Sequence, residues 1–208
     1  GLKLRMAGPV LGRIIKSESK DHFVSANLPM LHNRTVEDTG ESEFRPGINS
    51  ECNKIDLSGE FERQFFGDVM LFTMEKLTTM GYPAKPVPKQ IIIKTLESTE
   101  QEIRQQYAAK QVQIQDKLKL MKSIFFDSNK WWNTTSGMEP ARENFTIFIN
   151  NIEQNFGEDS RCYEIIDSDV NRSMCFKDML EAIIKYPADR QNWINVLERE
   201  RDKQTVGL

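Results

Sequence analysis

The chain has 208 residues, of which 38% are hydrophobic and 28% are charged, and its formal net charge is −3. That length suits one large domain or two small ones, and the mildly acidic balance excludes a general attraction of the whole molecule to nucleic acid or acidic membranes. No apolar run reaches the roughly 18–20 residues that a membrane-spanning helix needs, so no transmembrane segment is expected.

The first twenty residues carry a local basic excess, with five Lys or Arg side chains against one Glu. We favour a packed first helix with a solvated basic face. The alternative is an arm that contacts a membrane surface, an acidic partner or nucleic acid. In that case the candidate binding residues are Lys3, Arg5, Arg13 and Lys16.

The region 1–57 is expected to be irregular after its short basic helix. Residues 21–57 are rich in Asn, Asp, Ser, Gly and Pro, and Arg45-Pro46-Gly47 is a typical turn. The stretch from Phe23 to Leu31 predicts at most a short β element or extended segment. The N-terminal third therefore contributes little to a regular core.

A helix is predicted over 59–80, with Ser58 as its N-cap. Apolar residues recur on one face at helical spacing, which indicates burial of that face. Gly81 and Pro83 end the helix, because Gly adopts the left-handed position and Pro cannot continue a helix.

A second and much longer helix is predicted over about 89–126. Its apolar stripe is narrow and is surrounded by Lys, Gln and Glu. A dimeric coiled coil would need apolar residues throughout its seam, and Lys110 and Lys117 interrupt it. We therefore favour packing within the chain over self-association through the long helix. The stripe consists of Leu96, Ile103, Tyr107, Ile114, Leu118, Met121 and Phe125.

Two adjacent tryptophans, Trp131 and Trp132, lie in a loop predicted over 127–139. Paired tryptophans in a polar loop have two interpretations. The favoured one is buried packing at a hinge between subdomains. The other is an exposed site that binds a protein partner.

The C-terminal region, 138–208, is expected to form a helical subdomain. It follows a helical hairpin over 58–130 and the irregular region 1–57. Helices are predicted over 140–156, 161–166, 174–186 and 189–203, with Pro187 ending the third. We expect Trp193, Val196 and Leu197 to be buried in the last helix. The fold class expected for the whole chain is mainly α, with one long helix.

The segment 167–178 has the oxygen-rich spacing of a calcium loop. Asp167, Asp169 and Asn171 fall at the first, third and fifth positions, Ser173 at the seventh and Asp178 at the twelfth. This segment resembles the EF-hand family over about a tenth of the chain. It departs from that pattern at the sixth position, where the family has Gly, and at the twelfth, where it has Glu. The resemblance implies weak calcium or magnesium binding. The favoured alternative is an ordinary turn between helices with no bound cofactor.

No motif fixes a reaction. The three cysteines lack the spacing of a disulfide framework or a zinc site, which favours an intracellular, cytoplasmic protein. Phosphate-binding glycine loops and hydrolase motifs are absent from the sequence. The expected function is a non-catalytic helical interaction or scaffolding module with a protein partner. The alternatives are an EF-hand-like cation-binding module and a nucleic-acid-binding domain.

Overall fold

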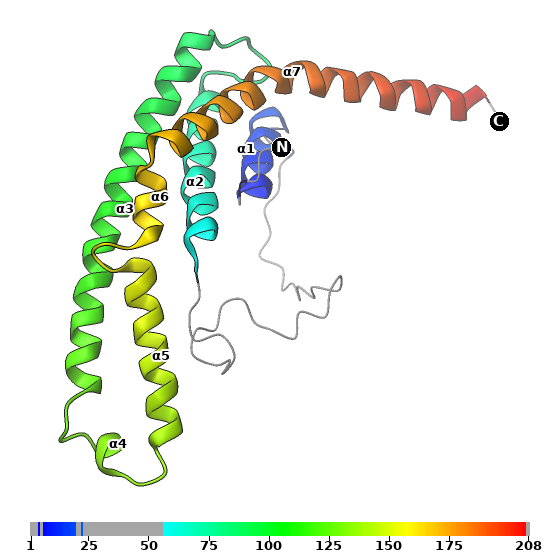
Figure 1. Ribbon diagram of the computed structural model, residues 1–208. Coiled ribbons are helices and arrows are strands. Elements are labelled where there is room, and N and C mark those ends of the chain that lie inside the picture. Colours follow the sequence, from blue (N-terminus) through cyan, green and yellow to red (C-terminus); the bar gives the residue numbers. More distant parts are fainter. Residues whose placement is uncertain (1–3, 5, 20–21, 23–55, 207–208) are drawn as a thin grey trace. The chain divides into compact units, whose positions relative to one another are not determined.

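The computed structural model describes residues 4, 6–19, 22 and 56–206, with side chains to residue 201. These residues form helices only, so the mainly-α expectation is confirmed for the described chain (Figure 1). The expected β element at Phe23 to Leu31 lies outside the described residues. The helices are α1 (Ala7–Ser19), α2 (Ser58–Thr79), α3 (Lys89–Phe125), α4 (Trp131–Thr134), α5 (Glu139–Phe156), α6 (Arg161–Asp167) and α7 (Asp169–Val206).

The chain divides into two compact units. Unit 1 contains α1, residues 63–79 of α2, residues 89–103 of α3, and α7. Unit 2 contains residues 56–62, residues 104–125 of α3, and α4, α5 and α6. Each unit therefore combines stretches that are far apart in sequence. The division into three consecutive regions, 1–57, 58–130 and 138–208, stays a prediction from the sequence.

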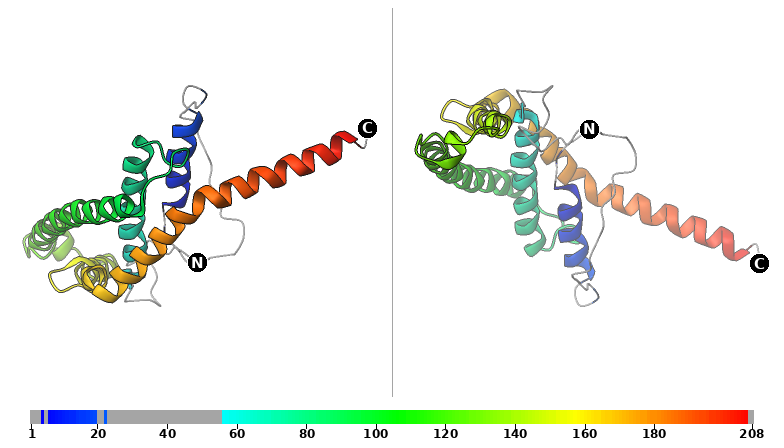
Figure 2. Two further views of the ribbon diagram at one scale, coloured as in Figure 1. Left: turned by 90° about the horizontal axis from the view of Figure 1, so that it is seen from above. Right: turned by 90° about the horizontal axis from the view of Figure 1, so that it is seen from below.

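Unit 1 is built around the apolar face of α2. Phe65 and Phe66 are fully buried and meet edge to face, with ring centroids 5.0 Å apart. Figure 2 shows α1 lying beside α7 in this unit. Further fully or nearly fully buried apolar side chains come from all four helices, among them Ile14, Val69, Met74, Leu77, Ile92, Leu96, Ile103, Met179 and Ile183.

Unit 2 is organised around an aromatic cluster centred on Phe61. The Phe61 ring lies edge-on to the rings of Tyr107 and Tyr163, at centroid distances of 5.4 Å and 5.0 Å. The backbone N–H of Leu57 donates a 2.8 Å hydrogen bond to Oδ1 of Asn155 in α5. These contacts attach the first residues of α2 to α5 and α6.

The long helix predicted over 89–126 is confirmed as α3. Leu96 and Ile103 of its apolar stripe are buried in unit 1, and Tyr107 and Leu118 are buried in unit 2. The chain itself therefore covers much of the stripe, as expected for intramolecular packing.

The expected break at Pro187 is wrong, because α7 runs through that residue. Pro has no backbone N–H, so the carbonyl of Ile183, four residues earlier, loses its usual helical donor. The hydroxyl of Tyr82 replaces it, donating a buried 2.9 Å hydrogen bond to the Ile183 oxygen. Burial raises the pKa of Tyr82 well above its ordinary value, so the phenol stays protonated and remains a donor.

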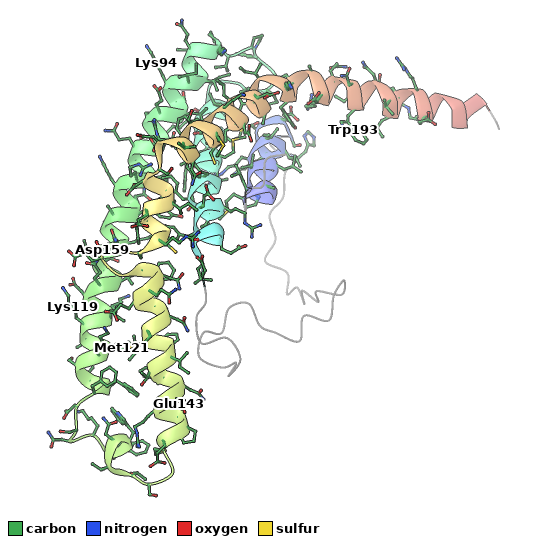
Figure 3. The ribbon with its side chains drawn as sticks, in the orientation of Figure 1. Lys94, Lys119, Met121, Glu143, Asp159 and Trp193 are labelled. Carbon is green, nitrogen blue, oxygen red and sulfur yellow. The ribbon has the colours of Figure 1, made fainter. Side chains whose placement is uncertain are left out.

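The burial expected for the last helix is also wrong. Trp193 and Leu197 are 69% and 62% exposed, and Val196 is exposed too (Figure 3 labels Trp193). After Ile183, no described side chain of α7 up to Arg201 is buried. The second half of α7 therefore has an apolar stripe without a covering layer in the described part of unit 1.

Candidate functional site

Within unit 2, α3 and α5 lie side by side and run in opposite directions (Figure 1). The ammonium of Lys122 is 2.5 Å from Oε1 of Glu153. Nearer the α4 end, the rings of Phe125 and Phe145 pack with centroids 4.4 Å apart. The two helices are thus joined by an exposed ion pair and an aromatic contact.

A cavity of about 400 Å³ lies between the ends of these two helices. Almost all of its lining is apolar, and among the described lining residues Lys117 alone is charged. Its volume falls within the range of pockets that hold ligands or anchor side chains. The lining residues are Lys117, Leu120, Met121, Ile124, Phe125, Trp132 and Phe145.

Large apolar side chains remain exposed in the lining of this cavity and at two sequence neighbours of lining residues. Their exposed fractions range from 36% to 62%, which is unusual for a cluster of Leu, Ile, Phe and Trp. We define this set as the unit 2 apolar surface: Leu120, Ile124, Phe126, Trp131 and Phe145.

The two tryptophans have different roles. The indole N–H of Trp132 donates a 3.1 Å hydrogen bond to the carbonyl of Phe125, the last residue of α3. The side-chain amide of Asn133 donates to the same oxygen at 2.7 Å and to the Asp127 carbonyl at 2.8 Å. The two donors to Phe125 satisfy a carbonyl that the end of α3 leaves without a helical partner.

Trp131 instead faces solvent and is 62% exposed. Its ring contacts that of Trp132 edge to face, at a centroid distance of 5.8 Å. Trp132 is thus half-buried within unit 2 and Trp131 is exposed, while a hinge role and partner binding stay predictions.

The sequence did not single out Leu120, Ile124 and Phe126 as surface residues. All three lie near the end of α3, outside the predicted apolar stripe. The sequence feature that points to this exposed surface is a widening of the apolar stripe. From Leu118 to Phe126, six of nine residues are apolar. A stripe that widens near a helix end indicates more apolar surface than one neighbouring helix covers.

The oxygen-rich segment 167–178 adopts a different conformation from a calcium loop. Asp167 ends α6, Ser168 is extended, and Asp169 begins α7. Asp169, Asn171, Ser173 and Asp178 therefore lie on one continuous helix. Residues two apart on a helix point to nearly opposite sides, so these side chains do not converge. Cation binding by this segment stays a prediction.

Two charged residues of the segment 167–178 form ion pairs with side chains of α3. Arg104 pairs with the Asp167 carboxylate and also donates a 2.9 Å hydrogen bond to the Ile166 carbonyl. Arg172 stands where an EF-hand has Gly. It forms two hydrogen bonds, of 3.1 Å and 3.2 Å, with the carboxylate of Glu100. The Glu100 side chain is 6% exposed, so this charge is buried against its partner.

The basic N-terminal candidates are only partly described. Lys3 and Arg5 lie outside the described residues. Arg13 pairs with Glu75 of α2, with nitrogen and oxygen 3.1 Å apart, and Lys16 is exposed. In the described part of the chain, no three His, Cys, Asp or Glu side chains group closely enough to hold a metal ion.

Cys162 is the most strongly perturbed thiol in the described residues. It is fully buried, and its Sγ lies 3.8 Å from Oδ1 of Asn155. Burial, with a smaller effect of the Asp56 charge, raises the pKa of Cys162 to about 12. Because the thiolate is the nucleophilic form, this cysteine is not suited to covalent catalysis.

The chain matches no known family model, no curated protein and no solved structure. Each helix in the described residues is too short or too polar to cross a bilayer. The unit 2 apolar surface is therefore judged on its own geometry.

Proposed function

We propose that this protein is a non-catalytic helical interaction module that binds a protein partner through the unit 2 apolar surface. One observation carries the proposal: Leu120, Ile124 and Phe145 line a largely apolar cavity and remain exposed. Phe126 and Trp131, which follow or precede lining residues in sequence, are exposed as well. Exposed apolar clusters of this kind are typical of protein interaction sites. Trp131 has the properties of an anchor residue, since Trp is enriched among residues that dominate binding energy.

The shape of the site favours an amphipathic helix as the partner element. Leu120 and Ile124 are one turn apart on α3, and Phe145 faces them from α5. A groove between two helices accepts apolar side chains spaced three or four residues apart on a third helix. Lys117 at the groove favours an acidic residue beside that apolar face.

The partner is identified by placing a photo-crosslinking amino acid at Leu120, with the same amino acid at Val112 as the control. Val112 is also an exposed apolar residue of α3, but it does not line the cavity. The captured protein is then produced in pure form and its affinity is measured by calorimetry. Both Trp131→Ala and Leu120→Asp are expected to weaken binding by about thirtyfold or more, as for anchor residues worth about 2 kcal/mol.

Val112→Asp is the matched control for affinity and is expected to leave binding unchanged. Circular dichroism and thermal unfolding verify that each variant keeps its fold. Equal affinity of wild type, Trp131→Ala and Leu120→Asp for the purified partner would contradict the proposal. Crosslinking from Val112 as efficient as from Leu120 would contradict it as well.

A further inference from the structure

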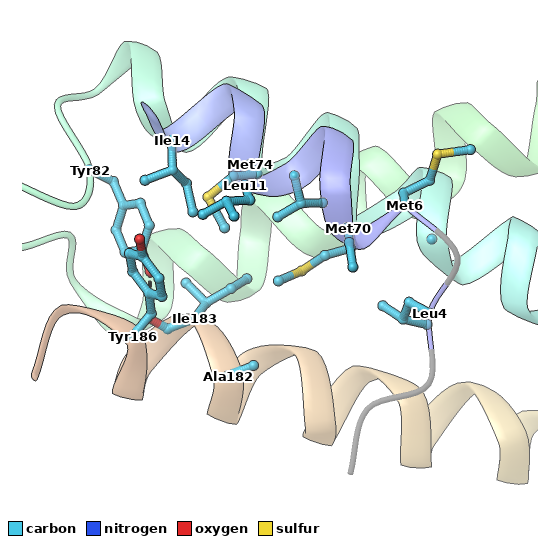
Figure 4. Close-up of a pocket in the computed structure, with 13 residues that line it drawn as sticks. Leu4, Met6, Leu11, Ile14, Met70, Met74, Tyr82, Ala182, Ile183 and Tyr186 are labelled. Carbon is cyan, nitrogen blue, oxygen red and sulfur yellow. Dashed lines mark hydrogen bonds between the residues drawn. The ribbon is translucent and has the colours of Figure 1, made fainter. Parts of the chain in front are cut away.

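Unit 1 contains a separate, partly open apolar cavity of about 220 Å³, bordered mainly by α1, α2 and α7 (Figure 4). It does not involve the unit 2 apolar surface. Protein interiors are close-packed and have few voids larger than a water molecule. A space of this size within a helical unit is therefore a candidate ligand site.

None of the described side chains that line the cavity is charged. Among these described side chains the polar atoms are the hydroxyls of Tyr82 and Tyr186, apart from the weakly polar methionine sulfurs. The Tyr82 hydroxyl already donates to the Ile183 carbonyl. A charged ligand would lose its hydration here without gaining an ionic partner, so the cavity favours a neutral molecule.

The lining also favours an aromatic ligand. Met70 and Met74 contribute their side chains from α2, and Met6 contributes from the residue before α1 (Figure 4). Thioether sulfurs make favourable contacts with aromatic rings and adapt to irregular shapes. Tyr82 and Tyr186 add two rings with centroids 6.3 Å apart and planes inclined by 35°. Such rings pack against a further ring by edge or offset contacts.

The volume sets the size of the ligand. A cavity of about 150 Å³ lined by apolar side chains stays dry and holds benzene. The larger space in unit 1 has room for two fused rings. We propose that the cavity bordered by α1, α2 and α7 binds a small neutral aromatic molecule of one or two rings.

The test uses indole as a neutral probe and indole-3-acetate as a charged analogue with the same ring system. Binding of each probe to the full chain is measured by calorimetry and by thermal shift. Indole is expected to bind saturably and to raise the Tm. Indole-3-acetate is expected to bind at least about tenfold more weakly, because none of the described lining side chains offers its carboxylate an ionic partner.

A cavity-filling variant locates the bound probe. Ala182→Phe places a ring into the cavity from α7, whereas Ala188→Phe adds the same ring at an exposed position of the same helix. Ala182→Phe is expected to reduce indole affinity by at least about tenfold, and Ala188→Phe is expected to leave it unchanged. Equal binding to the two variants would overturn the proposal.

Methyl NMR of the wild-type chain gives a measurement that does not depend on a folded variant. Indole is expected to shift the methyl resonances of Met6, Met70 and Met74. Those of Met121 and Met138, which belong to unit 2, are expected to stay in place. No saturable shift of the three cavity methionines, or equal shifts of all five, would overturn the proposal.

Discussion

At the scale of single residues, Arg172 shows how a side chain can be misjudged from its local sequence. In sequence it is a departure from an EF-hand pattern. In the structure it forms two hydrogen bonds with the buried carboxylate of Glu100, and its guanidinium lies 4.8 Å from the ring centroid of Phe176. The partner is 72 residues away along the chain, so no local pattern indicates the contact.

Replacing Arg172 with Ala is expected to destabilise the protein by roughly 2–3 kcal/mol, because a buried carboxylate loses its paired cation. Urea unfolding monitored by circular dichroism measures the change. The double variant Arg172→Ala with Glu100→Gln is expected to recover part of the loss, since the amide needs no counter-charge. A loss below about 0.5 kcal/mol in the single variant would show that the pair contributes little.

Cys162 gives a second expectation at this scale. Its raised pKa, about 12, keeps it a thiol near neutral pH, and its burial excludes reagents. At pH 8 we expect iodoacetamide to modify Cys162 at least about tenfold more slowly than the partly exposed Cys175. Peptide mass spectrometry over time measures both rates. The difference is expected to vanish in denaturant, and similar rates in the native protein would contradict the assignment.

At the scale of elements, open carbonyls at the end of one helix and inside another accept hydrogen bonds from side chains that lie outside those helices. The C-terminal carbonyl of α3 accepts hydrogen bonds from Trp132 and Asn133. The carbonyl that Pro187 leaves open in α7 accepts one from Tyr82. In both places the sequence indicates where a helix ends or contains proline, but it does not indicate which side chain donates to the open carbonyl.

The Tyr82 contact predicts a specific coupling. Tyr82→Phe is expected to cost about 1–3 kcal/mol, because the buried Ile183 carbonyl then lacks a donor. In a Pro187→Ala background the cost is expected to be much smaller, since Ala supplies the helical N–H. A double-mutant cycle by chemical denaturation measures this coupling. Additive effects of the two substitutions would contradict the role assigned to the hydroxyl.

At the scale of the whole molecule, each unit is assembled from stretches that are not consecutive in sequence. Unit 1 includes α1 and α7, from opposite ends of the described chain. The ion pair between Arg190 and Glu18, with nitrogen and oxygen 2.8 Å apart, joins these two helices. Beyond this contact, the described residues of α7 add exposed surface to the unit and no buried core.

Removing residues 192–208 is therefore expected to change the free energy of unfolding by no more than about 0.5 kcal/mol. Removing residues 186–208 is expected to destabilise unit 1, because it deletes Tyr186, Pro187 and the Arg190–Glu18 pair. Thermal unfolding of the two truncated chains compares them directly. A large loss on the shorter deletion would mean that Trp193 and its neighbours stabilise the chain itself.

Features of the fold that depend on local sequence patterns could be predicted, and features that depend on contacts between distant residues could not. The helices α2, α3 and α5 were predicted within one or two residues, because their apolar spacing and their stop signals are local. The continuity of α7 was missed because Tyr82 compensates for Pro187 from 105 positions away. For the candidate surface, the sequence indicated Trp131 but could not separate it from Trp132. Trp132 differs from Trp131 because its indole N–H donates to the Phe125 carbonyl. That carbonyl lacks a helical partner only because α3 ends at Phe125, and the exact end of a helix is not fixed by local sequence.

The hydrogen bond from Tyr82 to Ile183 has an evolutionary consequence. Proline at position 187 leaves the Ile183 carbonyl without a helical donor, and tyrosine at position 82 supplies one, so the residues at the two positions depend on each other. A descendant chain that lost the proline would tolerate phenylalanine at position 82. One that lost the phenol first would be selected to replace the proline, so the two positions should covary among any orthologues.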